Sequence, residues 1–226
     1  MQPAAPPAIR IPAAPRDGAE SAAWLERHEH FVARARQGGI DVLFLGDSIT
    51  DLFPVRGRHT WERRILPLGR VANFGISGDR THHLLWRVRN GELDGSGARV
   101  VVLLIGTNDL AFETPAGIAR GIVAIVETIR AKLPRAAVVL NAVLPRGAPD
   151  DALRANAADV NRRIAPLARG GRVLWVDAGP AFLDAGGRIP PELMPDGLHP
   201  AGAGYDAWAA ALRPVLVRAL ATEAQP

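Results

Sequence analysis

The sequence contains no cysteine among its 226 residues. Disulfide bonds and thiolate metal ligands are therefore excluded, although the absence of cysteine assigns no cellular compartment by itself. A chain of this length buries most of its apolar surface on folding, so it can form a hydrophobic core without covalent cross-links. We expect a single domain of ordinary size.

Lysine is almost absent, with Lys132 as its only example. The net charge of +4 comes from 27 basic and 23 acidic residues, and the abundance of arginine accounts for the high isoelectric point of about 10.7. The arginines are scattered, and no basic run is longer than a pair such as Arg63 and Arg64. Binding to a phosphate backbone requires a basic stripe. The sequence therefore predicts no nucleic-acid partner.

Long hydrophobic runs are also missing. The longest strongly apolar run, Val100 to Ile105, is too short to span a bilayer. The first twenty residues, "MQPAAPPAIRIPAAPRDGAE", are rich in proline and alanine and contain no hydrophobic signal core. We predict no membrane span and a cytoplasmic protein, or a secreted or periplasmic one if a signal peptide has been removed. Because proline excludes helix, residues 1–18 are predicted to be an extended or disordered arm before a single domain at 19–226.

Within that domain, apolar runs alternate with segments of helical periodicity. The runs are apolar at nearly every position, which is typical of parallel strands covered on both faces; they lie at 41–45, 70–74, 100–105, 136–142 and 172–176. Apolar residues at helical spacing fill the segments at 24–35, 118–133, 153–167 and 205–220. The last segment is expected to bend or break at Pro214. The pattern predicts a three-layer α/β/α fold with a parallel sheet of about five strands.

In such a sheet, ligands bind beyond the carboxyl ends of the strands. Small and polar residues follow three consecutive strands there: "GDS" ends at Ser48, "GISG" ends at Gly78, and "GTND" contains Asn108. Ser48 has the strand-to-helix setting of a nucleophile, but Thr50 occupies the place of the second glycine in the usual G-x-S-x-G elbow. A serine at the start of a helix is also a common N-cap. This segment alone leaves both interpretations open.

A nucleophilic serine requires a base and an acid that orients the base. Of the six histidines, His199 follows Asp196 by three residues in "PDGLHP", where the carboxylate can reach the imidazole within one turn. By itself such a D-x-x-H pattern is more often a capped turn with a surface histidine. His59 is predicted to lie in a polar loop. The backbone N–H groups of Ser48 and Gly78 and the amide of Asn108 are candidate donors to an oxyanion, although glycine and asparagine are also ordinary turn residues.

The four motifs together carry a family resemblance. "FLGDSIT", "NFGISGDRT", "IGTND" and "DGLHP" occur in this order and resemble the four sequence blocks of the SGNH, or GDSL, hydrolases. The stretch "NFGISGDRTHHLLWRVRNGELDG" is similar to the catalytic subunits of intracellular platelet-activating-factor acetylhydrolase and their bacterial relatives. The resemblance runs from about residue 24 to the final helix.

The resemblance implies a flavodoxin-like fold and a metal-free and cofactor-free serine esterase. It assigns the triad to Ser48, His199 and Asp196, and the oxyanion hole to Ser48, Gly78 and Asn108. The G-D-S turn accounts for the missing glycine and makes Asp47 a residue that shapes the turn rather than the triad acid. The resembled subunits pair, so a homodimer is one expectation.

The substrate is less well defined by the sequence. The resemblance favours small acyl groups, chiefly acetyl, on a lipid, glycan or small aromatic alcohol. Leu110 and Phe112 follow Asn108, so they either form a wall of the acyl site or pack into the core. A carbohydrate O-acetylesterase and a lysophospholipase- or thioesterase-like activity are alternatives.

Other classes of protein fit the sequence less well. A flavodoxin-like module that binds an anion or a nucleotide would leave Asp196 and His199 without a role, and the usual phosphate-loop and dinucleotide motifs are absent. A silent carbohydrate-binding protein would be expected to have an incomplete triad. A metallohydrolase using aspartate and histidine is a third alternative, which a chelator would test.

Overall fold

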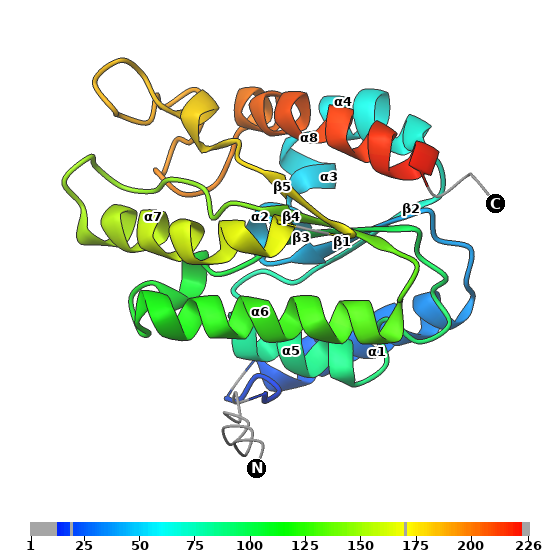
Figure 1. The fold of residues 1–226 in the computed structure, drawn as a ribbon. Coiled ribbons are helices and arrows are strands. Elements are labelled where there is room, and N and C mark those ends of the chain that lie inside the picture. The colour runs from blue at the N-terminus through cyan, green and yellow to red at the C-terminus, as the bar shows by residue number, and fades with distance from the viewer. Residues whose placement is uncertain (1–12, 19, 170, 223–226) are drawn as a thin grey trace, which may run out of the picture.

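Five parallel strands form one sheet at the centre of the molecule, with helices on both faces (Figure 1). The computed structural model describes residues 13–18, 20–169 and 171–222. The strands are ordered β2-β1-β3-β4-β5, so β1 lies between β2 and β3. Their bounds are Val42–Gly46 (β1), Val71–Gly75 (β2), Val100–Leu104 (β3), Ala137–Asn141 (β4) and Val173–Val176 (β5).

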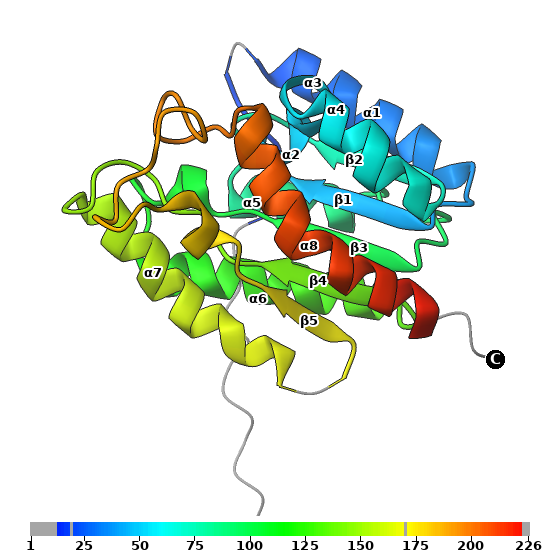
Figure 2. The same ribbon diagram turned by 90° about the horizontal axis from the view of Figure 1, so that it is seen from above.

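One face of the sheet is covered by four helices and the other by the long C-terminal helix with a group of short ones. The first set comprises α1 (Ser21–Arg36), α5 (Thr81–Arg89), α6 (Pro115–Lys132) and α7 (Ala152–Ile164). The second comprises α2 (Ser48–Asp51), α3 (Phe53–Arg56), α4 (Arg58–Thr60), a π-helical turn (Trp61–Ile65) and α8 (Gly202–Thr222). Short 3₁₀ turns lie at Leu66–Leu68, Thr107–Asp109, Ala165–Ala168 and Gly179–Phe182. Figure 2 shows α8 lying across its face of the sheet.

Successive residues of each strand enter opposite cores. In β1, Leu43 and Leu45 pack against α1, α5 and α6, whereas Val42 and Phe44 pack against α8 and the short helices. All four side chains are fully buried. Because both faces of the sheet are covered, every strand position favours an apolar residue, which explains the continuous apolar runs. The predicted three-layer α/β fold with about five parallel strands is confirmed.

Two local predictions need correction. The interruption that Pro214 could cause is absent, since α8 continues through it to Thr222. Its buried face on both sides of the proline, including Trp208 and Leu216, holds the helix against the sheet and offsets the lost hydrogen bond. His59 lies in the short helix α4 and not in a loop.

The predicted arm falls largely outside the described residues, since residues 1–12 are not among them. Residues 13–18 contain no regular secondary structure but contact the domain. The amide of Ala14 donates to the carbonyl of His82, and Ala13 packs against the core. Arg16 donates to the carbonyl of Ser77 at 2.8 Å. This end of the arm therefore lies beside the turn that contains Gly78.

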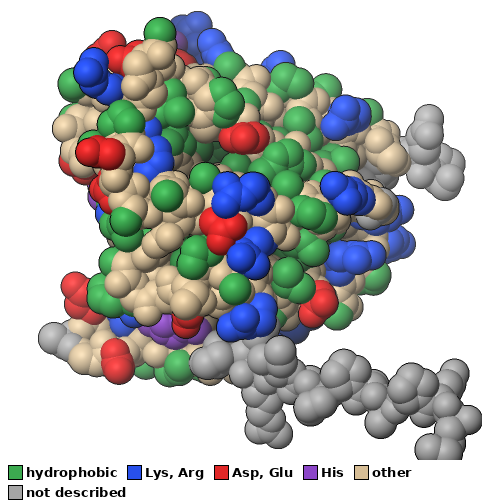
Figure 3. All heavy atoms as spheres, turned by 60° about the vertical axis from the view of Figure 1, so that its left-hand side comes forward, with side chains coloured by type: hydrophobic (Ala, Val, Ile, Leu, Met, Phe, Trp, Pro, Cys, Tyr) green, Lys and Arg blue, Asp and Glu red, His purple; other side chains and the backbone are tan. Residues whose placement is uncertain are grey.

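The surface shows no gathering of one charge on the face drawn in Figure 3. Acidic and basic side chains are interspersed there among apolar ones. In the described ranges, no helix combines the length and the apolar character that crossing a bilayer requires.

Candidate active site

Ser48 lies at the carboxyl end of β1, as the first residue of α2, and its side chain is almost fully buried. Asp47 is the N-cap of α2, since its Oδ1 accepts a hydrogen bond from the amide of Ile49 at 3.0 Å. The capping function that could have been assigned to Ser48 therefore belongs to its neighbour. Ser48 Oγ lies 2.9 Å from Nε2 of His199.

The turn between Met194 and α8 brings Asp196 and His199 together. Asp196 Oδ2 lies 2.7 Å from His199 Nδ1, and Oδ1 accepts hydrogen bonds from the amides of Leu198 at 3.0 Å and His199 at 2.7 Å. Gly197 adopts a positive φ of 67°, which lets the chain fold back so tightly. The two amides hold the carboxylate in place, so its second oxygen is directed at the imidazole. Ser48, His199 and Asp196 thus form one hydrogen-bonded chain.

The charge states of Asp196 and Asp47 follow from their contacts and burial. Partial burial opposes the charge on Asp196, but the hydrogen bonds from the backbone and ring of His199 outweigh it and lower the pKa of Asp196 to about 2. An ionised carboxylate can only accept, so Nδ1 of His199 carries the proton. Nε2 then presents its lone pair to the hydroxyl of Ser48. Asp47 behaves in the opposite way, because complete burial raises its pKa to about 7.

Gly78 lies in the turn that follows β2, next to β1 in the sheet. Its φ of 80° is in the left-handed region, where a side chain would introduce strain. The preceding residue ties the turn to the nucleophile helix, because the amide and hydroxyl of Ser77 donate to Oδ2 of Asp51 at 3.2 and 2.6 Å. The Gly78 turn is therefore anchored to α2, three residues beyond Ser48.

Asn108 lies in the 3₁₀ turn that follows β3, on the other side of β1. Its Nδ2 donates to the carbonyl of Asp79 at 2.9 Å, which joins it to the residue after Gly78. Asp109 reinforces the link by accepting from the amide and hydroxyl of Thr81. Burial raises the pKa of Asp109 to about 6 despite these hydrogen bonds. The three turns that carry Ser48, Gly78 and Asn108 are thus connected to one another.

The loop after β4 connects the Asn108 turn to the histidine turn. Arg146 donates to the carbonyl of Thr107 at 3.0 Å, and the amide of Gly147 donates to the carbonyl of Gly197 at 3.0 Å. Neither Arg146 nor Gly147 stands out in the sequence as a site residue. They join two loops of the site through contacts between segments that are distant in the sequence, and no local sequence pattern reveals such contacts.

The two predicted pocket residues lie in different environments. Leu110 is buried in the core on the face of the sheet that α1, α5, α6 and α7 cover. Phe112 is 70% exposed, and the guanidinium of Arg80 lies 3.9 Å from the centre of its ring. Both follow Asn108 in the chain, but only Phe112 reaches the surface. It borders a hollow of about 240 Å³ between the start of α5 and the segment after Asn108.

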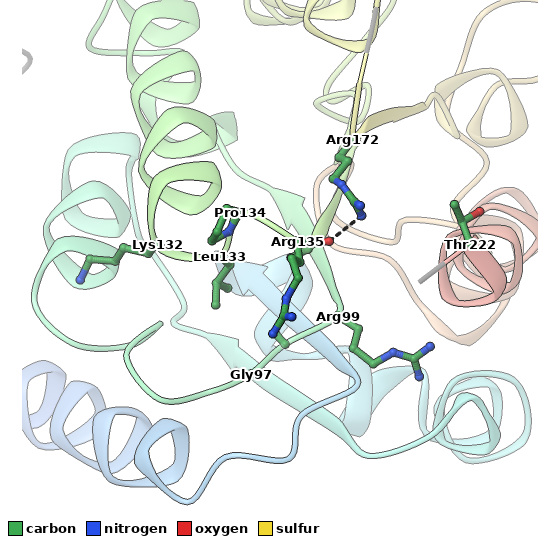
Figure 4. Close-up of a pocket in the computed structure, with 10 residues that line it drawn as sticks. Gly97, Arg99, Lys132, Leu133, Pro134, Arg135, Arg172 and Thr222 are labelled. Carbon is green, nitrogen blue, oxygen red and sulfur yellow. Dashed lines mark hydrogen bonds between the residues drawn. The ribbon is translucent and has the colours of Figure 1, made fainter. Parts of the chain in front are cut away.

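A larger hollow, of about 960 Å³, lies at the opposite, amino end of the strands (Figure 4). Of the basic side chains that surround it, three donate to backbone carbonyls: Arg172 to that of Arg135, Arg99 to that of Leu220, and Lys132 to that of Arg89. The last two carbonyls lie at the carboxyl ends of α8 and α5, where cations offset the negative end of the helix dipole. The structure around them explains these three cations, and the lining of the hollow includes none of Ser48, Gly78, Asn108, Asp196 and His199.

In the part of the chain that the structure describes, no group of three or more histidine, aspartate or glutamate side chains is placed to hold a metal ion. The chemistry available at the site is that of a hydroxyl, an imidazole, a carboxylate and several N–H donors. This set is suited to acyl transfer.

Comparison with known proteins agrees with this arrangement. The sequence pattern of the GDSL-like lipase/acylhydrolase family matches residues 44–207. The human platelet-activating factor acetylhydrolase IB subunit alpha1 is 37% identical over 201 residues, covering 88% of this chain and 85% of the relative. The bovine alpha2 subunit is 36% identical over 196 residues, covering 86% and 84%.

Solved structures share the fold. A GDSL-like lipase from Bacteroides thetaiotaomicron superposes with a TM-score of 0.73 at 23% identity, covering 86% of this chain and 97% of that one. An acetylxylan esterase from Geobacillus stearothermophilus superposes with a TM-score of 0.64 at 22% identity, covering 81% and 94%. The resemblance to the SGNH, or GDSL, hydrolases that the four sequence motifs indicate is confirmed.

Proposed function

This chain belongs to the GDSL-like lipase/acylhydrolase family and is a carboxylic ester hydrolase of the SGNH type, and we propose that it removes short acyl groups, chiefly acetyl, through Ser48, His199 and Asp196. The observation that carries the proposal is the hydrogen-bonded chain from Ser48 Oγ through His199 to Asp196, with distances of 2.9 and 2.7 Å. It lies at the edge of the sheet where the carboxyl ends of the strands meet.

In the proposed mechanism, Ser48 Oγ attacks the ester carbonyl while Nε2 of His199 takes the hydroxyl proton. Asp196 stabilises the imidazolium that forms, because the low pKa of Asp196 keeps its carboxylate ionised. The same proton is then given to the departing alcohol, so the ester C–O bond breaks and an acyl-serine remains. Water, deprotonated by His199, releases the acid and regenerates Ser48.

The developing oxyanion would be stabilised by the N–H groups of Ser48 and Gly78 and by the amide of Asn108. The Asn108 amide has two hydrogens, of which one is directed to the carbonyl of Asp79. The other remains for the substrate. Since the first bond fixes the plane of the amide, the donor is oriented before the reaction begins, which is the property that makes such donors effective.

The acetyl preference is supported by the names of the relatives. The 37% identical human protein is a subunit of an acetylhydrolase, and a structural neighbour is an acetylxylan esterase. The former favours a phospholipid-like alcohol and the latter an acetylated glycan. The likeness to the esterase extends to the fold alone, so the higher identity makes the lipid-like ester the first candidate and the acetylated glycan the second.

A hydrolysis panel tests the proposal. Acetyl to octanoyl p-nitrophenyl esters, an acetyl phospholipid and acetylated xylan would be compared for the wild type and for Ser48→Ala. We expect kcat/KM to fall as the acyl chain lengthens and Ser48→Ala to lose most turnover while it stays folded. Equal rates for acetyl and octanoyl esters would contradict the acyl preference. Near wild-type rates in Ser48→Ala would contradict the assignment of the nucleophile.

A further inference from the structure

We propose that Asp79 is a positioning residue that holds the oxyanion hole together, with Arg87 bound to one oxygen of its carboxylate and Trp24 and Arg16 to the other. The proposal rests on the function proposed above. Asp79 directly follows Gly78, is fully buried and is not part of the triad. Its carboxylate and its backbone carbonyl both contact groups outside its own turn. Asp79 thereby links the segments that carry the three proposed oxyanion donors, Ser48, Gly78 and Asn108.

Arg87 binds one oxygen of the Asp79 carboxylate and is itself completely buried in α5. Arg87 Nε donates to Asp79 Oδ2 at 2.8 Å. The rest of the guanidinium donates to the carbonyl of Phe74 at 2.9 Å and to that of Gly46 at 3.3 Å. These carbonyls lie at the carboxyl ends of β2 and β1, from which the turns of Gly78 and Ser48 begin. One guanidinium therefore connects Asp79 to both strand ends.

The charge of Arg87 is balanced within the same cluster. Glu92 Oε2 accepts from Arg87 Nη1 at 2.6 Å, and its other oxygen lies 2.9 Å from Nδ1 of His28. Arg87 thus has two buried carboxylate partners and two backbone carbonyls. Such a fully hydrogen-bonded buried network has a single favoured geometry, because an unpaired charge in the core is costly.

The other carboxylate oxygen of Asp79 accepts from two side chains that precede the first strand, Arg16 and the buried Trp24. Trp24 Nε1 donates to Asp79 Oδ1 at 2.7 Å, and Arg16 Nη2 donates to the same oxygen at 3.2 Å. Arg16 Nη2 also donates to the carbonyl of Ser77 at 2.8 Å. Arg16 therefore contacts the residues on both sides of Gly78 and covers the outer side of its turn.

The third donor is reached through the backbone of Asp79, whose carbonyl accepts the Asn108 amide at 2.9 Å. A rotation of the Asp79 peptide would move the Gly78 turn and release the Asn108 amide together. The carboxylate contacts of Asp79 oppose that rotation. Loss of the Trp24 and Arg16 hydrogen bonds should therefore impair transition-state binding more than substrate binding, which is the signature of an oxyanion donor.

The test uses variants that leave the buried Asp79–Arg87 pair intact. Trp24→Phe removes the Nε1–H donor and keeps an aromatic ring, and Arg16→Met removes the guanidinium while keeping most of the stem. Trp86→Phe is a matched control, because Trp86 packs 5.5 Å from Trp24 between ring centres but donates no hydrogen bond to Asp79. Glu20→Gln is the second control, since it alters only the exposed partner of Arg16.

The readouts are kcat and KM for p-nitrophenyl acetate and the affinity for a trifluoromethyl ketone, which forms a tetrahedral adduct with serine. We expect kcat of the Trp24→Phe/Arg16→Met double variant to fall about tenfold or more, with KM changed less than about twofold. Inhibitor affinity should weaken by the same factor as kcat. Both control variants should match the wild type at temperatures below their unfolding midpoints.

The outcomes separate this inference from the proposed function. If Ser48→Ala is inactive while the double variant is folded and keeps the kcat and inhibitor affinity of the controls, the positioning role of Asp79 is overturned and the esterase assignment stands. A parallel loss of kcat in Trp86→Phe would overturn it as well, because the loss would then follow packing rather than the hydrogen bond. If Ser48→Ala remains active, the proposed function itself fails.

Discussion

Ser48 Oγ and His199 Nε2 lie 2.9 Å apart although 151 residues separate them in the chain. The sheet places Ser48 at the end of β1, and the turn before α8 returns His199 to the same edge. Tyr205 secures the approach, since its hydroxyl donates to the carbonyl of Ile49 at 2.8 Å. The first turn of α8 is thereby tied to α2, and the position of His199 relative to Ser48 follows from this contact between helices.

Asp196→Asn is expected to lower kcat by roughly 10³–10⁴ while the protein stays folded. The amide can donate to Nδ1 of His199, which favours the tautomer whose Nε2 carries a proton and cannot accept from Ser48. Steady-state kinetics on p-nitrophenyl acetate measure the effect. Asp184→Asn is the matched control, because Asp184 accepts two backbone amides in a turn, as Asp196 does, but orients no histidine. Comparable kcat in the two variants would contradict the role of Asp196.

Asn108→Ala should lower kcat by about 10²–10³ with little change in KM, because one of the proposed oxyanion donors is lost. Asn90→Ala provides the comparison, since Asn90 also donates its amide to a backbone carbonyl but lies at the end of α5. A loss that appears in KM alone would show that Asn108 binds the substrate rather than its transition state.

Asp47→Asn should stabilise the protein at neutral and alkaline pH. Burial raises the pKa of Asp47 from 3.8 to about 7, so between these values the folded state holds a proton that the unfolded chain has released. The free energy of unfolding of the wild type therefore falls as the pH rises through this window. The amide keeps the acceptor for Ile49 and cannot ionise.

Denaturant unfolding at several pH values measures this difference. The advantage of Asp47→Asn should grow from about pH 4 to pH 7 and then level off, reaching at most about 4 kcal/mol. Asp109, whose pKa is also raised by burial, is present in both proteins, and its charge is one of the causes that raise the pKa of Asp47. A difference in stability that does not vary with pH would show that Asp47 is ionised throughout.

Gly46→Ala should destabilise the fold by about 1–3 kcal/mol or more and impair catalysis. A Cβ at this position would overlap the hydroxyl of Thr50 and the carbonyl of Leu104, so α2 could not approach the strand ends as closely. Gly202→Ala is the control, because there a Cβ meets only the Arg56 carbonyl at 3.8 Å. Thermal unfolding of both variants checks the expectation, and equal midpoints would refute it.

The sequence was sufficient to predict the sheet because its strands are buried on both faces, as in "VLFL" at residues 42–45, where every side chain has an apolar environment. It failed where tertiary packing overrides local preference. Pro214 should break a helix on local grounds, yet the buried residues on either side hold α8 continuous. The short helices between Phe53 and Leu68 likewise depend on contacts with α8 rather than on a periodic pattern of their own.

The candidate site divides in the same way. The placement of Ser48, Gly78, Asn108, Asp196 and His199 at one edge of the sheet could be predicted because each follows a strand or precedes a helix within a short motif. Asp79 stands in one of those motifs, but its contacts with Trp24 and Arg87 join three separate segments. Spacing along the chain does not encode such contacts. The role of Asp79, which is buried beside the predicted donor Gly78, can therefore be recognised only when the fold shows its partners.

Covalent labelling with a fluorophosphonate, followed by peptide mass spectrometry, tests whether Ser48 is the nucleophile. The reagent forms a stable tetrahedral adduct with a serine that is activated by a histidine. We expect one phosphonyl group per chain, on the peptide that contains Ser48, with loss of esterase activity in proportion to labelling and no labelling of Ser48→Ala. Labelling of another residue in step with the loss of activity, or full activity after Ser48 is labelled, would contradict it.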